Sequence, residues 1–417
     1  MVDLIISNAK VWRGHDVAID TIDLFISEGK FCKQDGHQQS SNDISIIDAA
    51  GRLCVAGFLE PHIHLDKALI NEDVRPNISG TLAEAIEIIW ERKRDYVVDE
   101  ITERAIRVIR AAVGNGVTRI RSHVDVDNIG GLRPLNGVAA AREHCRDLVE
   151  IEIVAFPQEG ILKNHGTEDL MWKAMESGAD IVGGMPFNEQ SLEDSSRHID
   201  TAFEIAKAFN ADIDMHVDET DDPDAKTLKM LAEKTLKNGW EGRVTAGHTC
   251  ALAGYSDTYA AIVISLVKEA GINMITNPAT NLMLQGRLDS QPKRRGITRV
   301  KELLAEGINV SYGQDCVKDT FYPFGRVDPL EVGLITAHAA HMSLPNEIAQ
   351  VFDMQTTAAA KLMNLNDYGF TPGCAADLVI LDATSPAEAL CQQSSRAMIF
   401  KGGKLIVENK KERKWHP

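Results

Sequence analysis

Short runs of β-branched and other apolar residues recur along the chain at a nearly constant spacing. Each run is bounded by Gly, Pro or Asp, and segments of helical period lie between them. The runs begin at Leu53, Val117, Ile151, Asp180, Ala211, Arg243, Ile272 and Ile308. From the second run onward, successive starts lie 29 to 36 residues apart, which is the length of a strand, a helix and their two connections. The pattern predicts strands that alternate with helices.

The segments between the runs have the period of amphipathic helices. Residues 201–209, for example, place Phe203, Ala206 and Phe209 on one stripe. Strict alternation of strand and helix favours parallel pairing, and eight strands fit a closed (β/α)8 barrel, a TIM barrel, better than a Rossmann sheet of about six strands. No G-x-G-x-x-G follows the first run. We therefore predict an α/β fold built on a (β/α)8 barrel.

The two ends of the chain have a different pattern. Residues 1–56 and 372–417 consist of short strand-like runs and turns, such as residues 3–12, 376–382 and 396–409. We expect both ends to form one small composite β domain. The remaining residues, 57–371, then form the barrel domain, and their number is typical of that fold.

Composition and charge narrow the class of partner. The chain of 417 residues has 44 Lys and Arg against 61 Asp and Glu, a formal net charge of −17. An acidic surface of this kind repels phosphate, which argues against nucleic acid and anionic membrane as partners. The longest strongly apolar runs, such as residues 260–267, are much shorter than the roughly 18 residues of a membrane span. Because no signal peptide is apparent, we expect a cytoplasmic protein. The acidic charge favours a small molecule as its partner.

Polar residues gather where the predicted strands end. His62 and His64 follow the first strand and lie two residues apart, so both imidazoles face the same side. His216 ends the fifth strand, His248 the sixth, and Asp315 follows the eighth. The carboxyl ends of parallel barrel strands meet at one mouth. We therefore expect these side chains to converge.

Imidazoles together with one carboxylate suit a single divalent metal ion, Zn2+ or Fe2+, with one position left for water. Such an ion lowers the pKa of bound water from 15.7 to about 7. Glu219, three residues past His216, is the natural proton shuttle between that water and a substrate nitrogen. The alternatives are a loop carboxylate for Glu219 and a core histidine for His248. For His123 and Asp125 we favour a structural role.

Six further segments of the sequence, besides the individual His and Asp positions, are informative about the family of the protein. They are residues 60–68, 122–126, 153–162, 272–278, 285–304 and 307–315. Together with the His and Asp positions, these segments resemble the bacterial cytosine deaminases of the amidohydrolase superfamily, in the same order and over almost the whole barrel. The small β domain from both chain ends is also typical of that superfamily.

The resemblance implies a role for each residue that matches the family's motifs. The implied metal ligands are His62, His64, His216 and Asp315. His248 would lie near the attacking hydroxide, Glu219 would protonate the ring nitrogen, and Asp315 would also take the proton of the water. Ammonia would then leave from the ring.

Three further residues are implied to bind the substrate. Gln158 matches the glutamine with which the family binds the ring, and a carboxamide offers a donor and an acceptor side by side. Phe156 is a core residue or a pocket wall. Cys316 stands where the family has a second Asp after the metal-binding one, and its smaller thiol would make room for a methyl group at C5 of the ring. Gln314 and Phe321 also depart from the family's pattern. We therefore expect cytosine or 5-methylcytosine as the substrate.

Other functions on the same scaffold stay open. The chain could hydrolyse another cyclic amidine, a cyclic amide or an N-alkylamino-triazine. Two-metal relatives use a lysine on the fourth strand, and residues 181–187 contain none, which favours one metal and deamination. A metal-bearing binding protein without turnover is a further alternative. Since relatives commonly assemble, we expect a homo-oligomer.

Overall fold

A parallel barrel forms the larger part of the molecule. The computed structural model describes residues 2–33, 44–412 and 414–416, and within them strands β6 to β13 pair in chain order. The strands are β6 (Phe58–Ile63), β7 (Val117–Asp125), β8 (Glu150–Phe156), β9 (Ile181–Gly184), β10 (Ile213–Val217), β11 (Val244–His248), β12 (Asn273–Thr276) and β13 (Val310–Tyr312). The predicted (β/α)8 fold is confirmed.

The last strand returns to the first through residues of the predicted site. The backbone N–H of His64 donates to the carbonyl of Asp315 at 3.0 Å, and the N–H of Asp315 donates to the carbonyl of His62 at 2.8 Å. Asp315 has a φ of +64°, a left-handed conformation that non-glycine residues rarely adopt. The nearly closed barrel thus brings two distant parts of the chain together at its mouth.

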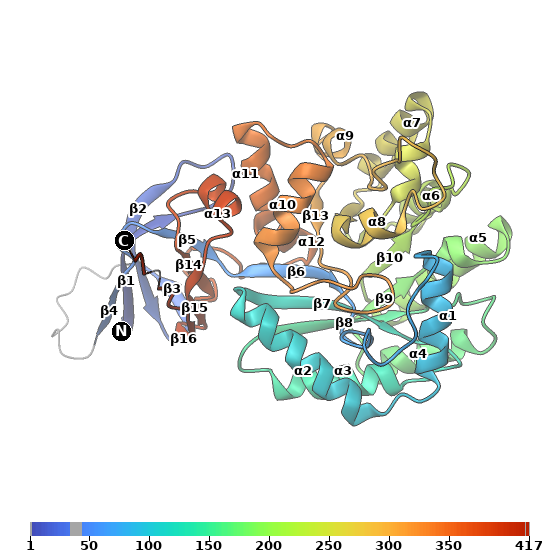
Figure 1. Cartoon of the computed structure of the whole chain (residues 1–417), viewed down its shortest axis with the longest axis horizontal. Helices are drawn as coiled ribbons and strands as arrows, with labels where there is room; N and C mark the ends of the chain where they lie inside the picture. The colour runs from blue at the N-terminus through green and yellow to red at the C-terminus, as the bar shows by residue number, and fades with distance from the viewer. Residues whose placement is uncertain (1, 34–43, 413, 417) are drawn as a thin grey trace.

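Helices surround the barrel (Figure 1). They are α1 (Leu82–Lys93), α2 (Val98–Gly114), α3 (Arg133–His144), α4 (Thr167–Glu176), α5 (Leu192–Phe209), α6 (Thr227–Asn238), α7 (Asp257–Glu269), α8 (Pro278–Leu284), α9 (Val300–Ala305), α10 (Pro329–Ala339), α11 (Pro345–Asp353) and α12 (Thr357–Leu362). As expected from its stripe, α5 buries Phe203 and Ala206, whereas Phe209, its last residue, is 37% exposed. Within the described residues, no helix has the length and apolarity that a membrane crossing requires.

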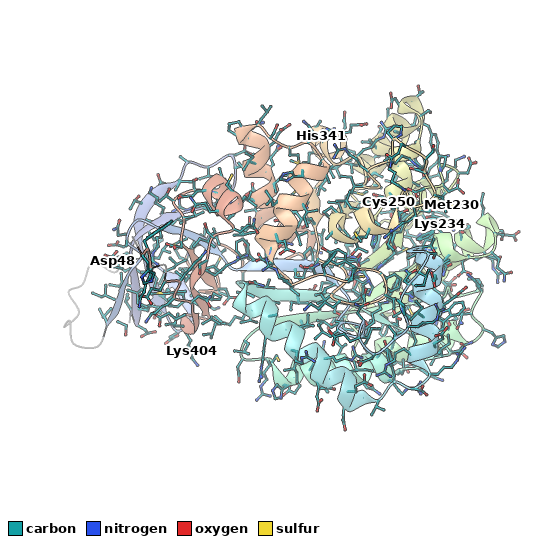
Figure 2. All side chains as sticks on the ribbon, in the orientation of Figure 1. Asp48, Met230, Lys234, Cys250, His341 and Lys404 are labelled. Atoms are coloured by element: carbon teal, nitrogen blue, oxygen red, sulfur yellow. The ribbon has the colours of Figure 1, made fainter. Side chains whose placement is uncertain are left out.

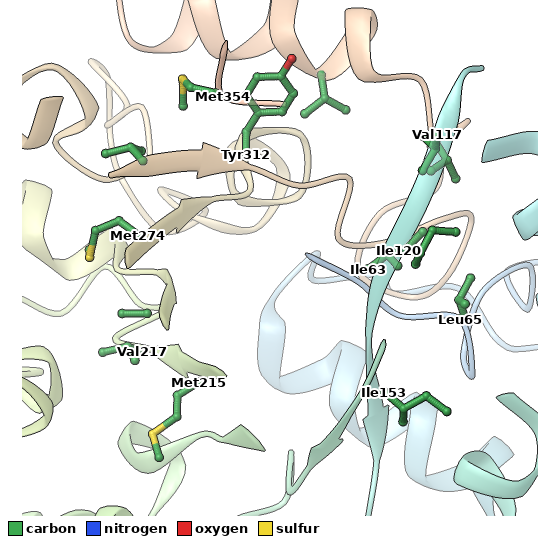
Figure 3. Close-up of a cluster of buried hydrophobic side chains, with 14 of the residues drawn as sticks. Ile63, Leu65, Val117, Ile120, Ile153, Met215, Val217, Met274, Tyr312 and Met354 are labelled. Atoms are coloured by element: carbon green, nitrogen blue, oxygen red, sulfur yellow. The ribbon is translucent and has the colours of Figure 1, made fainter. Parts of the chain in front are cut away.

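Apolar side chains from neighbouring strands form a continuous core in the barrel. Figure 3 shows part of it, including Ile63, Ile120, Ile153, Met215 and Met274, all of which are buried. Near-continuous burial along each strand is typical of a parallel sheet that is covered on both sides. This packing holds the strand ends, and therefore the side chains at the mouth, in fixed positions.

A second sheet is built from both ends of the chain. Its strands are β1 (Leu4–Val11), β2 (Asp20–Ser27), β3 (Lys30–Cys32), β4 (Ser45–Asp48), β5 (Leu53–Ala56), β14 (Leu378–Leu381), β15 (Arg396–Lys401) and β16 (Lys404–Glu408). Figure 1 shows it beside the barrel, with both termini in it. In Figure 2, Asp48 and Lys404 lie on this sheet, whereas Met230 and Cys250 lie on the barrel.

The chain passes from the end sheet into the barrel at Gly57. The run that begins at Leu53 contains two strands, β5 in the end sheet and β6 in the barrel. A Cβ atom on Gly57 would lie 2.2 Å from the side-chain oxygen of Thr118, so only glycine fits at this crossing. The exact domain boundaries, 1–56 with 372–417 and 57–371, stay a prediction.

Candidate active site

Four side chains form a compact cluster at the barrel mouth, which we call the ligand cluster: His62, His64, His216 and Asp315. One potential ligand atom from each lies within 4.8 Å of all the others. Nε2 of His64 is 3.1 Å from Nε2 of His216 and 3.3 Å from a carboxylate oxygen of Asp315. All four residues are buried. The structure therefore brings together the four residues expected to bind a metal.

The protonation of these side chains suits a cation. Burial lowers the pKa of His64 to about 3 and that of His216 well below its usual value, so both imidazoles are neutral. For Asp315, burial would raise the pKa, but the neighbouring imidazoles of His248, His62 and His64 lower it well below its usual value. Neutral imidazoles and an ionised carboxylate are the forms that bind a divalent ion.

Unpaired atoms in the cluster also indicate a missing positive partner. The Nδ1 atom of His64 lies 3.1 Å from the carbonyl oxygen of His123, which only an N–H can satisfy, so the lone pair is on Nε2. That lone pair faces His216 Nε2. Among the described residues, both ring nitrogens of His62 and Nδ1 of His216 have no hydrogen-bond partner. The donor set therefore fits a divalent metal ion.

Glu219 and His248 lie beside the ligand cluster. A carboxylate oxygen of Glu219 is 3.2 Å from Nδ1 of His248, and the ring of His248 is 4.6 Å from that of His216 between centroids. Burial and the charge of Asp315 raise the pKa of Glu219 well above its usual value. Burial lowers the pKa of His248 to about 3. A protonated carboxyl beside neutral imidazoles can act as a proton donor.

Two asparagines that the sequence analysis missed hold this pair. The amide of Asn281 lies 3.2 Å from Glu219 and 3.0 Å from Nδ1 of His248, and the amide of Asn277 lies 3.1 Å from Nε2 of the same ring. Asn277 directly follows β12, so its position at a strand end was an available signal, whereas Asn281 lies in α8. They fix the orientation of the imidazole and the carboxyl.

A small chamber opens in front of the ligand cluster. The space between its lining residues, together with the part that is open to solvent, is about 310 Å³. Seven of the predicted residues line it: His64, Phe156, Gln158, His216, Glu219, Asp315 and Cys316. His62 and His248 lie behind this wall, in ring contact with His216. All nine predicted site residues thus lie together.

The three predicted substrate-binding residues occupy different walls. Phe156 stacks on the ring of His216, with 4.0 Å between centroids. The thiol of Cys316 is buried, and burial raises its pKa well above the usual value, which keeps it protonated and a poor nucleophile. The amide oxygen of Gln158 is 2.5 Å from the ammonium of Lys67, another chamber residue that the sequence analysis did not single out. Gln158 therefore accepts a hydrogen bond from Lys67 through one of the two lone pairs of its amide oxygen.

Lys67 belongs to a second buried cluster, the charged network: Lys67, Lys93, Asp125, Asp127 and Glu159. Lys67 donates to Asp125 at 2.7 Å. Lys93 lies 2.7 Å from Asp125, 2.6 Å from Asp127 and 3.2 Å from Glu159. The two ammonium groups offset most of the charge of the three carboxylates. Asp125 is ion-paired within this network, and the structural role expected of it stays a prediction.

A TIM barrel whose mouth gathers three imidazoles and an aspartate beside a protonated glutamate has the architecture of a metal-dependent hydrolase. Residues 91–405 match the amidohydrolase family, and the chain belongs to this family. It is a hydrolase of the amidohydrolase superfamily that acts on C–N bonds and uses a divalent metal ion.

Known proteins similar to the chain include one with a solved structure. The 5-methylcytosine deaminase of Klebsiella pneumoniae, liganded with 5-fluorocytosine, is 36% identical, with a TM-score of 0.93 over 99% of both chains. The N-isopropylammelide isopropyl amidohydrolase of a Pseudomonas species is 30% identical and covers 87% of this chain and 88% of its own. The pterin deaminase of Rhizobium rhizogenes is 33% identical over 84% of this chain and 79% of its own.

Proposed function

We propose that the protein deaminates a free pyrimidine base by hydrolysis. The substrate is cytosine or a C5-substituted cytosine such as 5-methylcytosine, and the products are uracil or thymine and ammonia. The observation that supports this most is the position of Glu219, a buried carboxyl with a raised pKa that lines the same small chamber as His64, His216 and Asp315. This arrangement suits proton transfer to a ring beside a bound ion.

Each side chain of the chamber then has a task. His62, His64, His216 and Asp315 would hold a divalent ion, which when bound would lower the pKa of a water and so activate it at neutral pH. Glu219 donates its proton to the ring nitrogen next to the carbon that bears the amino group. Asp315, which is ionised and lies 3.3 Å from His64, accepts the proton of the water. His248, kept neutral by burial, lies against Glu219 and steadies it.

The chamber walls select the ring. Phe156 is a flat wall beside His216, and the free amide nitrogen of Gln158 donates to a ring acceptor. Cys316 faces the C5 edge, where its apolar thiol admits a methyl group. Burying one methyl group contributes about 0.8 kcal/mol. The similarity to the 5-methylcytosine deaminase over nearly the whole of both chains supports 5-methylcytosine as the better substrate.

A second candidate substrate is a different amino-substituted ring. The relatives named for isopropylammelide and pterin are 30% and 33% identical, which supports an N-alkylamino-triazine or a related cyclic amidine as the alternative. Both candidates use the same ligand cluster and the same proton donor. Homo-oligomeric assembly, cytoplasmic location and the choice between zinc and iron stay predictions.

A substrate panel tests the proposal. Protein loaded with zinc or ferrous iron, with its metal content measured, is incubated with cytosine, 5-methylcytosine, N-isopropylammelide and pterin, and the released amine is identified. We expect ammonia from the two pyrimidines and faster release from 5-methylcytosine. Isopropylamine from the triazine, with no ammonia from either pyrimidine, would replace the first candidate with the second. No release from any ring would refute both.

A further inference from the structure

A buried carboxylate outside the chamber holds the loop that carries Gln158. Three successive residues of this loop, Ile161, Leu162 and Lys163, donate their backbone N–H groups to the side chain of Glu189, at 2.6, 3.1 and 2.8 Å. Successive N–H groups of this kind form a concave site for an anion. The loop that begins after β8 is therefore folded around the carboxylate of Glu189.

The position of Glu189 is closely defined. Its side chain is 0% exposed, and a Cβ atom on Gly160, which has a φ of +88°, would lie 2.9 Å from its Oε1. Only glycine allows so close an approach with this backbone conformation. Burial would raise the pKa of Glu189, but the hydrogen bonds from His198 and from the N–H groups of Leu162 and Lys163 lower it below its usual value. Glu189 is therefore an ionised acceptor.

His198, in α5, connects Glu189 to a second wall of the chamber. Its Nε2 lies 3.1 Å from the backbone nitrogen of Met185, and its Nδ1 lies 2.7 Å from Oε1 of Glu189. Because a backbone N–H can only donate, Nε2 carries the lone pair and Nδ1 carries the proton that is donated to Glu189. Met185 lines the chamber, as Gln158 does. One buried pair, His198 and Glu189, thus holds two walls.

A third contact reaches Gln158 itself. The side-chain amide of Asn188, the residue before Glu189, donates to the backbone carbonyl of Gln158 at 2.7 Å. The amide nitrogen of Gln158 is buried and has no hydrogen-bond partner among the described residues. A hydrogen bond weakens steeply when its distance or angle departs from the optimum. The backbone position of Gln158 therefore decides how well this nitrogen can donate to a ring in the chamber.

We propose that Glu189 is a positioning residue that acts through Gln158. Oriented by His198, it fixes the loop so that the amide nitrogen of Gln158 reaches the ring. Neither Glu189 nor His198 lines the chamber, so neither touches the substrate. This inference rests on the proposed function, because Gln158 must bind the ring, and it applies to a pyrimidine and to a triazine alike.

A purely structural role for Glu189 predicts a different result. Buried N–H groups that lose their acceptor destabilise a protein wherever they lie. Such a loss lowers stability without raising KM in particular, and it does not depend on the side chain of Gln158. A positioning role instead makes the effects of Glu189 and Gln158 on substrate binding depend on each other.

A double-mutant cycle between the two residues tests the proposal, with the ring that the substrate panel identifies. In Glu189→Gln one oxygen becomes an NH2 group, which meets an N–H group whichever way the amide turns, because N–H groups face both oxygens. We expect it to lower kcat/KM about tenfold, mainly through KM, with unchanged metal content. Gln158→Ala should lower kcat/KM about thirtyfold. The double variant should also lose about thirtyfold, and a loss of about three-hundredfold, the product of independent effects, would refute the inference.

Asp353→Asn is the matched control. The carboxylate of Asp353 forms the same kind of pair with Nδ1 of His15, at 2.6 Å, and accepts the indole N–H of Trp12 at 2.9 Å, but it does not line the chamber. We expect this variant to lose stability and to keep KM within about twofold. An equal rise of KM in Asp353→Asn and Glu189→Gln would show that KM only reports lost stability, which would refute the inference.

Two further variants keep the test decisive. His198→Asn retains an N–H group close to the place of Nδ1, so KM should stay within about threefold, whereas His198→Leu should raise KM as Glu189→Gln does. Equal KM values in the two His198 variants would contradict the role of His198. If Glu189→Gln does not fold, Asn188→Ala, which removes the donor to the Gln158 carbonyl, takes its place in the cycle.

Amide hydrogen exchange without ligand separates this inference from the proposed function. We expect the N–H groups of Ile161, Leu162 and Lys163 to exchange at least about tenfold faster in Glu189→Gln, and at the original rate in Asp353→Asn. Unchanged exchange in Glu189→Gln would refute the inference whatever the substrate is. If no ring releases an amine, the proposed function is refuted, and the Kd of uracil replaces kcat/KM in the cycle. Absence of uracil binding would then refute the inference as well.

Discussion

The ligand cluster and the charged network lie at the same barrel mouth, and both are buried, but they satisfy their polar groups in opposite ways. In the ligand cluster, neutral imidazoles face one another, and several ring nitrogens have no partner among the described residues. In the charged network, Lys93 alone contacts three carboxylates. The imidazoles of one cluster lack partners, whereas the carboxylates of the other share ammonium groups, although Oε2 of Glu159 has no hydrogen-bond partner among the described residues.

The difference indicates which buried polar groups serve ligands. An unpaired buried donor or acceptor costs about 1–3 kcal/mol, so a cluster of them is stable only if a ligand satisfies it. A paired network needs no ligand and instead holds the strand ends together. Lys67 belongs to the network but also lines the chamber, as does Gln158, whose amide nitrogen has no hydrogen-bond partner among the described residues. Lys67 therefore has both a structural contact, in the charged network, and a position in the wall of the chamber.

The largest expected effect is that of removing a metal ligand. His216→Ala should lose most of its bound metal and about ten-thousandfold in kcat/KM, about 5 kcal/mol. The thermal midpoint of the metal-free protein should fall as well, because the change removes a buried ring that stacks on Phe156. Metal analysis and ammonia assays check this, with the exposed His338→Ala as the control. A His216→Ala variant with full metal content would contradict the assignment of the ligand cluster.

Glu219→Gln should separate metal binding from proton transfer. The carboxamide keeps the shape and the contact with Asn281 but cannot give up a proton, so kcat should fall about a thousandfold, about 4 kcal/mol. Metal content should stay at the level of the unmodified protein. Full activity in this variant would rule out Glu219 as the proton shuttle.

In the charged network, the expected effect is on stability. Lys93→Met leaves the carboxylates of Asp125, Asp127 and Glu159 without their shared cation, and the free energy of unfolding should fall by about 3 kcal/mol. Metal content should stay unchanged. Lys234→Met, which removes a partly exposed ion pair with Asp200 (Figure 2), should cost less than about 1 kcal/mol. Denaturant unfolding compares the two, and equal losses would argue against a structural role for the network.

The ligand cluster could be predicted from the sequence, but the charged network could not. Ligand identity is local: His62 and His64 lie at a spacing of two on one strand, and His216 and Asp315 end two others. The partners of Lys67 are not local, because Asp125 and Gln158 come from two other strands, and only barrel closure sets their distances. A lysine after a strand end is also typical of a solvated surface. The orientation of the Gln158 amide therefore had to come from the structure.

The fold could also be predicted from the sequence, because its signal is local. Apolar runs at constant spacing are a local pattern, and each run contains a barrel strand. The exception is the first run, where β5 and β6 follow each other without a polar break, and the close approach of Gly57 to Thr118 decides where one sheet ends. A contact between distant residues of this kind leaves no periodic signal.

Asp319 is a buried polar group of a third kind. Its environment predicts that the stability of the protein depends on pH. Its carboxyl accepts the backbone N–H groups of Phe321 and Tyr322 and has no cationic partner among the described residues. Burial raises its pKa from 3.8 to about 7. Between these two values the unfolded chain loses the proton while the folded chain keeps it, so this contribution to stability is lost as the pH rises.

Asp319→Asn should remove that loss while keeping the oxygen that accepts both N–H groups. Relative to the unmodified protein, the variant should gain about 2 kcal/mol in free energy of unfolding between pH 5 and pH 8. Unfolding of the metal-free proteins in denaturant at the two pH values measures this. A stability difference that is the same at both values would show that Asp319 is ionised in the folded state.

The smallest expected effect concerns substrate choice at Cys316, which follows the ligand Asp315 in the chain and lines the chamber. Cys316→Asp should lower the kcat/KM ratio of 5-methylcytosine to cytosine about tenfold, about 1.4 kcal/mol, because the larger, charged group fills the space of the methyl. Cys316→Asn separates size from charge and should lower the ratio by a similar factor. Cys316→Ser keeps the size and should leave it within about threefold. If the aspartate variant keeps the original ratio, the methyl group binds elsewhere in the chamber.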